Sequence, residues 1–157
     1  MVGNNNNALK RPTAAFTKRL IEEYPEAKVV LTVRDADSWL KSMRKTIFQS
    51  LTIPITSEKG KRTRAMSKAV IMDGILNDIQ SGKEPDEEIM KEKYSEHNAW
   101  VQLNVPSARL LLLNLGEGWD RLCTFLEMPV PDVPYPHSNS AEEFTQHCKE
   151  GIHPYLK

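Results

Sequence analysis

The chain has 157 residues, which suits one domain of ordinary size and is too short for two. Lys plus Arg and Asp plus Glu each total 21, and this neutral balance argues against nucleic acid or an anionic membrane as the main partner. The 2 cysteines lack metal-ligand spacing, no apolar run approaches about 20 residues, and no signal core is present. We therefore expect a reduced, soluble, cytoplasmic protein without a metal site.

The first third of the chain predicts a tail, a helix and a strand. Residues 1–11 should be a disordered tail, because their asparagine run has low helix propensity and nothing to bury. A helix should begin near Pro12, and three residues form an apolar stripe along it: Phe16, Leu20 and Tyr24. Residues 28–34 are rich in β-branched residues without polar alternation, which predicts a strand buried on both faces of a parallel sheet.

The middle of the chain predicts two helices separated by a loop. Asp35 or Asp37 can cap the first, and its buried side is formed by Trp39, Met43 and Ile47. Residues 49–61 contain proline, serine and glycine and are expected to form a loop. The second helix should end at residues 81–82, and these side chains should point inward: Met66, Ala69, Val70, Ile75, Leu76 and Ile79.

The last part of the chain predicts a long helix, a second strand and a shorter helix. The long helix should run from Asp86 to Asn104, because Pro106 prevents its continuation. Its apolar stripe consists of Met90, Tyr94, His97 and Val101. Residues 109–115 should form a strand and residues 116–128 a helix, followed by a proline-rich loop and a short helix through residue 144. This order of elements is an α/β pattern, mostly helical, with two parallel strands.

The stretch after the first strand is the most informative for function. Arg34 lies at the carboxyl end of that strand, where open α/β sheets bind ligands. Ser38 and Ser42 are one turn apart on one face of the next helix, so a guanidinium and a hydroxyl could hold a phosphate there. The alternative is that Arg34 pairs with Asp35 or Asp37 and the serines are simply exposed.

Four ordered sequence blocks resemble the fungal and invertebrate sulfotransferase-like family of P-loop fold, over about residues 11–145. The blocks are Tyr24-Pro-Glu-Ala-Lys-Val-Val-Leu-Thr-Val-Arg-Asp-x-x-x-Trp, His97-Asn98, Glu117-Gly-Trp-Asp-Arg-Leu-Cys-x-Phe-Leu and Pro129-Val-Pro-Asp-x-Pro-Tyr-Pro-x-x-Asn139. The resemblance implies sulfuryl transfer from 3′-phosphoadenosine 5′-phosphosulfate (PAPS) to a hydroxyl or amine of a small-molecule acceptor, without a metal.

The resemblance also implies roles for single residues. Arg34 and Ser42 would grip the 3′-phosphate of PAPS, because the family has an arginine at a strand end and a serine eight positions later. Ala36 stands where the family commonly has proline. His97 is a candidate general base that would deprotonate the acceptor, although its place on an apolar stripe also fits a core histidine. Glu117 begins a helix, where the dipole alone would explain a carboxylate.

One family feature has no counterpart in the sequence. No glycine-rich loop with a lysine follows a strand, although such a loop would cradle the phosphosulfate group. We therefore expect residues 12–157 to be an N-terminally truncated, partial domain without the P-loop strand, and a weak or inactive enzyme. The alternative is a non-catalytic interaction module, or an incomplete gene product, that dimerises or binds a partner through an unpaired sheet edge at residues 29–33.

Overall fold

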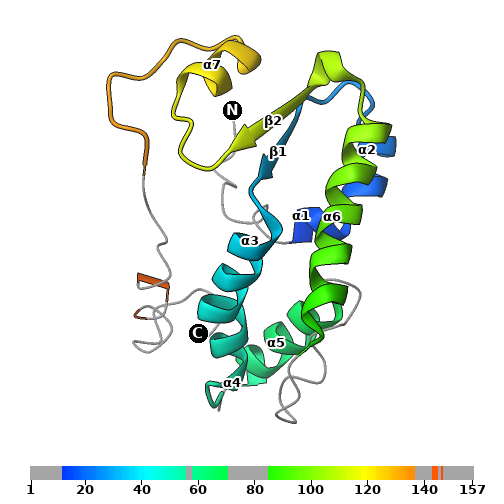
Figure 1. The fold of residues 1–157 in the computed structure, drawn as a ribbon, viewed down its shortest axis with the longest axis vertical. Coiled ribbons are helices and arrows are strands. Elements are labelled where there is room, and N and C mark those ends of the chain that lie inside the picture. The colour runs from blue at the N-terminus through cyan, green and yellow to red at the C-terminus, as the bar shows by residue number, and fades with distance from the viewer. Residues whose placement is uncertain (1–11, 56–57, 71–84, 137–142, 145, 147–157) are drawn as a thin grey trace.

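The computed structural model describes residues 12–55, 58–70, 85–136, 143–144 and 146. These residues form a mostly helical α/β structure, as the sequence predicts (Figure 1). In chain order the elements are α1 (Pro12–Ala15), α2 (Thr17–Glu23), β1 (Val29–Val33), α3 (Ala36–Met43), the π-helix η1 (Arg44–Phe48), α4 (Gln49–Thr52), α5 (Glu58–Val70), α6 (Glu87–Asn104), the 3₁₀ turn η4 (Ser107–Arg109), β2 (Leu110–Asn114) and α7 (Asp120–Leu126).

The two strands pair in parallel, which confirms the predicted sheet. The register runs from Val29 opposite Leu110 to Val33 opposite Asn114, so both strands end at the same edge. Helix α6 packs against β1, and α7 packs against β2. In Figure 1, α6 runs back alongside α3 and β1 in the opposite chain direction. The residues that follow the two strands therefore share one edge of the sheet, and α6 lies beside β1.

The expectation that β1 is buried on both faces is wrong. Its exposure alternates along the strand, and the Val30 side chain is 37% exposed. Paired residues of parallel strands share a face, so Val30 lies on the same face as Leu111, which is buried. The reason is coverage: α7 packs against β2, and the Val30 side of β1 is left open within the described part of the chain.

A single bent helical stretch, α3–η1–α4, follows β1. The Asp35 carboxylate caps it by accepting the Ser38 N–H at 2.7 Å. The stretch continues to Thr52, so the loop expected from residue 49 is wrong at its start, and α5 already begins at Glu58. The π-helical turn keeps the stretch helical through residues that bury apolar side chains, and it ends where Ile53, before a proline, becomes extended.

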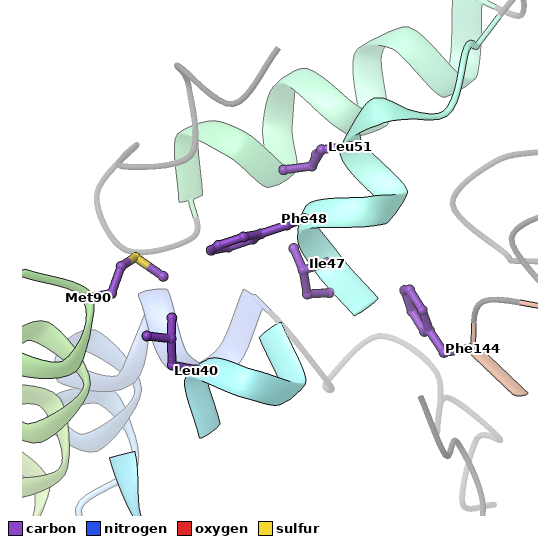
Figure 2. Close-up of a cluster of buried hydrophobic side chains, with 6 residues drawn as sticks. All are labelled: Leu40, Ile47, Phe48, Leu51, Met90 and Phe144. Atoms are coloured by element: carbon purple, nitrogen blue, oxygen red, sulfur yellow. The ribbon is translucent and has the colours of Figure 1, made fainter. Parts of the chain in front are cut away.

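A cluster of buried side chains lies between this helical stretch, α6 and residue 144 (Figure 2). Its buried side chains are Leu40, Ile47, Phe48, Leu51, Met90 and Phe144, with Trp39, Met43 and Ile53 packed against them. Figure 2 shows Leu40 and Met90 together on one side of the cluster and Phe144 approaching from the side of Ile47. The predicted inward side of the helix after Arg34 is thus confirmed.

Helix α6 has the predicted start, end and buried stripe. Asp86 caps it by accepting the N–H groups of Glu88 and Ile89. Met90 and Val101 are fully buried, and the two stripe residues between them, Tyr94 and His97, are half-buried. An amphipathic period of 3.6 residues therefore predicts this helix correctly. On its buried side the helix carries two side chains with polar groups, those of Tyr94 and His97.

Three other expectations need correction. The stripe along the first helices is largely exposed, with Phe16 at 49% and Tyr24 at 63%, and α1 and α2 are separate because Phe16 leaves helical geometry. In α5, Met66 and Ala69 are exposed instead of inward. The helix expected from residue 116 begins only at Asp120. Residues 1–11, the predicted helix beyond α5 and the final tail lie outside the described residues.

Candidate functional site

The candidate site lies at the edge of the sheet where both strands end. Arg34 directly follows β1, and residues 115–119 directly follow β2. Because the strands are parallel with Val33 opposite Asn114, the two following segments begin side by side. Ligands of open α/β sheets bind at this edge, since backbone groups and side chains of several connections converge there.

The Arg34 side chain is held against the first turn of α3. Its Nη2 donates to the Ser38 carbonyl oxygen and, at 2.7 Å, to the Ser38 hydroxyl. Its Nε is buried and has no hydrogen-bond partner among the described residues. A buried donor without a partner is rare in folded proteins, so the Arg34 guanidinium keeps hydrogen-bonding capacity that the described residues do not use.

The acidic neighbours of Arg34 have other partners. Asp35 caps α3 through the Ser38 N–H, and Asp37 forms an ion pair of 2.8 Å with Lys91 of α6. The alternative in which Arg34 is neutralised by one of these carboxylates is therefore not what the structure shows. The guanidinium instead contacts a neutral serine, which leaves its positive charge available to an anion.

The structure brings Arg34 into contact with Ser38, whereas Ser42 lies one helical turn further along the same face of α3. The Ser42 side chain is half-buried, and its carbonyl accepts the Thr46 hydroxyl at 2.7 Å. Because Ser38 accepts from the guanidinium, its own O–H remains a donor. The face therefore offers two hydroxyls in line from the guanidinium, of which the sequence analysis selected only Ser42.

Tyr94 joins α6 to the junction between β1 and α3. Its hydroxyl accepts the Arg34 backbone N–H at 3.2 Å and donates to the Arg34 carbonyl at 3.1 Å. Its ring stacks on Trp39, with 4.6 Å between ring centroids and 16° between ring planes. Sequence reasoning placed Tyr94 on a core stripe and missed these bonds. The phenol group was the available signal, since a buried Tyr O–H usually finds a hydrogen-bond partner.

Ion pairs reinforce the contact between α3, η1 and α6. Lys91 bridges Asp37 at 2.8 Å and Glu88 at 3.2 Å, and Arg44 contacts Glu87 at 2.6 Å. The hydrogen bond to Asp37 is the main reason why the pKa of Lys91 is raised. Pairs of this exposed kind stabilise little by themselves. Here they add to the Trp39 stack and fix which part of α6 faces α3.

His97 lies one turn beyond Tyr94 on α6, about 4.5 Å along the helix axis. Since α6 runs opposite to β1 (Figure 1), this turn leads away from the carboxyl edge of the sheet. The side chain is half-buried, and burial lowers the pKa of the imidazole. His97 is therefore neutral at neutral pH, which is the form that accepts a proton.

The turn after β2 is held by Glu117. Its carboxylate accepts the Asn114 side-chain amide at 2.5 Å and pairs with Arg121 at 2.6 Å, and the bond from Asn114 is the main cause of its lowered pKa. Gly116 and Gly118 adopt φ of 90° and 83°, with open space where a Cβ would lie. These glycines are needed for backbone conformation, and the contacts of Glu117 fit the structural role that its position at a helix start suggests.

Within the described ranges, no three His, Cys, Asp or Glu side chains gather in a way that could hold a metal ion. No helix in that part of the chain has the length and apolarity needed to cross a membrane. Cys123 is a buried free thiol on α7, as expected for a small core residue.

Comparison with known proteins identifies the family. A family model described as "Sulfotransferase domain" matches residues 1–144, a range that includes the whole candidate site. A curated relative, "Ava biosynthesis cluster protein M" of Aspergillus versicolor, is 31% identical over 143 residues, covering 87% of this chain and 55% of the relative. The chain thus spans little more than half the length of that relative. By this match, the chain belongs to the sulfotransferase-domain family.

Proposed function

We propose that this chain binds the 3′-phosphate end of PAPS at Arg34 and contributes that half of the donor site to a sulfotransferase. The observation that supports the proposal is the state of Arg34. It follows a parallel strand at the ligand-binding edge, contacts a serine instead of a carboxylate, and has a buried Nε without a partner among the described residues.

A phosphate would be recognised mainly by side chains. The Arg34 guanidinium would donate to a phosphate oxygen from Nη1, because Nη2 donates to Ser38 and Nε is buried, and Ser42 would add an O–H donor from the same helix face. The first turn of α3 contributes less, because the Asp35 carboxylate already accepts the Ser38 N–H. The dipole of α3 still favours negative charge near its start.

In this proposal the bound PAPS supplies the sulfuryl group, and a hydroxyl or amine of a small molecule accepts it. Arg34 and Ser42 bind and orient the nucleotide. His97 is the candidate base that takes the proton from the acceptor: burial lowers the pKa of its imidazole, which favours the neutral, proton-accepting form, and it lies one turn of α6 further from the carboxyl edge than Tyr94. The acceptor pocket would be built by variable helices and loops, so its chemistry is not specified by these residues.

We further propose that the 157-residue chain by itself transfers sulfuryl groups slowly or not at all. Neither described strand is followed by a glycine-rich loop with a lysine: β1 leads into Arg34 and Asp35, and β2 leads into residues 115–119, which contain no lysine. Donors that stabilise charge developing on the leaving group supply a large part of the rate in such reactions. Binding of nucleotide without turnover is therefore the expected behaviour.

Isothermal titration with adenosine 3′,5′-bisphosphate tests the site. Charge-assisted hydrogen bonds contribute about 1.5–3 kcal/mol, so we expect Arg34→Ala to weaken binding about 10- to 100-fold and Ser42→Ala to weaken it less. Arg19→Ala removes an exposed arginine of α2 and serves as the matched control, with unchanged affinity. Equal affinity of Arg34→Ala and the control would refute the site.

A non-catalytic interaction module is the second candidate, because β1 pairs only with β2 among the described residues, so its other edge is unpaired there, and its Val30 is 37% exposed. Unpaired strand edges recruit further chains, and a second copy is the simplest partner. Light scattering should then show association that rises with concentration and is lost in Val30→Lys. Leu103→Lys, at a side chain that is 85% exposed on α6, should associate like the wild type. A monomer at all concentrations would contradict this candidate.

A further inference from the structure

We propose that Tyr94 is a positioning residue that sets the geometry of Arg34 for phosphate binding. This inference rests on the proposed function and adds a residue from α6 to a site otherwise built by β1 and α3. Tyr94 has no contact with the phosphate in this account. It acts through the backbone of Arg34, to which its hydroxyl donates and from which it accepts.

The position of these two bonds in the sheet is the first reason. The parallel ladder ends at the pair Val33 and Asn114, and Arg34 is the next residue of the chain. The Tyr94 hydroxyl is the hydrogen-bond partner of both the N–H and the C=O of Arg34, at the point where the hydrogen bonds between the two strands end. The Arg34 backbone is therefore fixed at both of its polar groups, immediately before the chain turns into α3.

The rigidity of Tyr94 is the second reason. Its ring stacks on Trp39, the residue directly after Ser38, with 4.6 Å between centroids. The Lys91–Asp37 ion pair ties α6 to α3, and the Arg44–Glu87 ion pair ties α6 to η1. The Tyr94 ring is held in place by these contacts, so its hydroxyl has a fixed position. Through Tyr94 the backbone of Arg34 is linked to the same turn of α3 that the Arg34 guanidinium contacts.

The consequence for binding follows from the length of the arginine side chain. Contact with a phosphate needs the donating guanidinium N–H group to be correctly placed, and a small rotation at Cα displaces the far end of the side chain. Tyr94→Phe removes the hydroxyl but keeps the ring and its stack. We expect this variant to fold and to bind adenosine 3′,5′-bisphosphate about 5- to 20-fold more weakly, because a guanidinium that is less well placed makes a weaker charge-assisted hydrogen bond to the phosphate.

A double-mutant cycle separates positioning from general structural support. Dissociation constants for adenosine 3′,5′-bisphosphate are measured by ligand-observed NMR, which reaches weak binding, for the wild type, Tyr94→Phe, Arg34→Ala and the double variant. If Tyr94 acts through Arg34, Tyr94→Phe changes the affinity less than twofold once Arg34 is alanine. Tyr24→Phe, which removes an exposed tyrosine hydroxyl, is the matched control and should bind like the wild type.

The possible results are distinguishable. If Tyr94→Phe weakens binding equally in both backgrounds, or not at all, the positioning role is wrong while the phosphate site at Arg34 stands. If Arg34→Ala binds like the wild type, the proposed function itself fails and the role of Tyr94 fails with it. Loss of affinity confined to the Arg34 background supports both.

Discussion

Arg34 is partly satisfied within the protein, and this limits how it can bind a ligand. One guanidinium nitrogen is committed to Ser38, while the buried Nε has no partner among the described residues. The residue spacing pointed to Ser42, and the direct contact is with Ser38, one turn earlier. A spacing rule identifies the helix face correctly. It cannot select between two hydroxyls on that face, because the choice depends on the rotamer of a long side chain.

His97 predicts a pH dependence of stability. Burial lowers its pKa in the folded state, so the unfolded chain binds the proton more tightly. The free energy of unfolding should therefore be highest above the unfolded pKa of about 6.5 and fall as the pH drops below it. Urea unfolding at pH 7.5 and 5.5 should show a smaller loss of stability in His97→Gln than in the wild type.

The comparison of the two proteins isolates His97, because every other titrating group is common to both. The carboxylates with lowered pKa, Glu117 and Glu127, titrate below this pH window. Identical losses of stability in the wild type and in His97→Gln would show that the imidazole is not the group responsible.

Helix α6 connects the core to the candidate site. Its stripe buries Met90 in the cluster of Figure 2, then presents Tyr94 to the backbone of Arg34. The sequence predicted this helix well, because a capping aspartate, a regular apolar period and a following proline agree.

The α3–η1–α4 stretch was harder to predict. The proline, serine and glycine after residue 49 suggested a loop, whereas burial of Phe48 and Leu51 favours continued helix.

Truncation of Met90 tests the packing of α6 against that stretch. Its side chain is 0% exposed, so Met90→Ala should leave a cavity and lower the free energy of unfolding by about 3 kcal/mol. Ile89→Ala, at the neighbouring residue with 47% exposure, is the control and should cost less than about 1 kcal/mol. Denaturant titration measures both, and equal losses would mean that α6 does not pack as described.

At the scale of the whole molecule, the helices cover the two parallel strands unevenly. The sequence predicted the pair of strands from two apolar runs, but not that Val30 would be open while Leu111 on the same face is buried. The exposure of a strand residue depends on where α6 and α7 pack against the sheet, which a local sequence pattern does not predict. The exposed Phe16 and Tyr24 show the same point, since a helical stripe needs a partner surface before it becomes core.

The family assignment and the structure agree on one region of the chain. The sulfotransferase-domain match covers residues 1–144, and the contacts of Arg34, Ser38 and Tyr94 lie within it. The chain nevertheless spans 55% of the length of its curated relative, so the activity of a complete protein remains a proposal. The claim that can be tested directly on this chain is that it binds the nucleotide.

A crystal structure of the chain with adenosine 3′,5′-bisphosphate is the most direct measurement of that claim. We predict the 3′-phosphate at the carboxyl edge of the sheet, within hydrogen-bond distance of the Arg34 guanidinium and of a serine hydroxyl of α3. A nucleotide bound elsewhere, or a 3′-phosphate facing solvent while Arg34 keeps its contacts with Ser38 alone, would contradict the account.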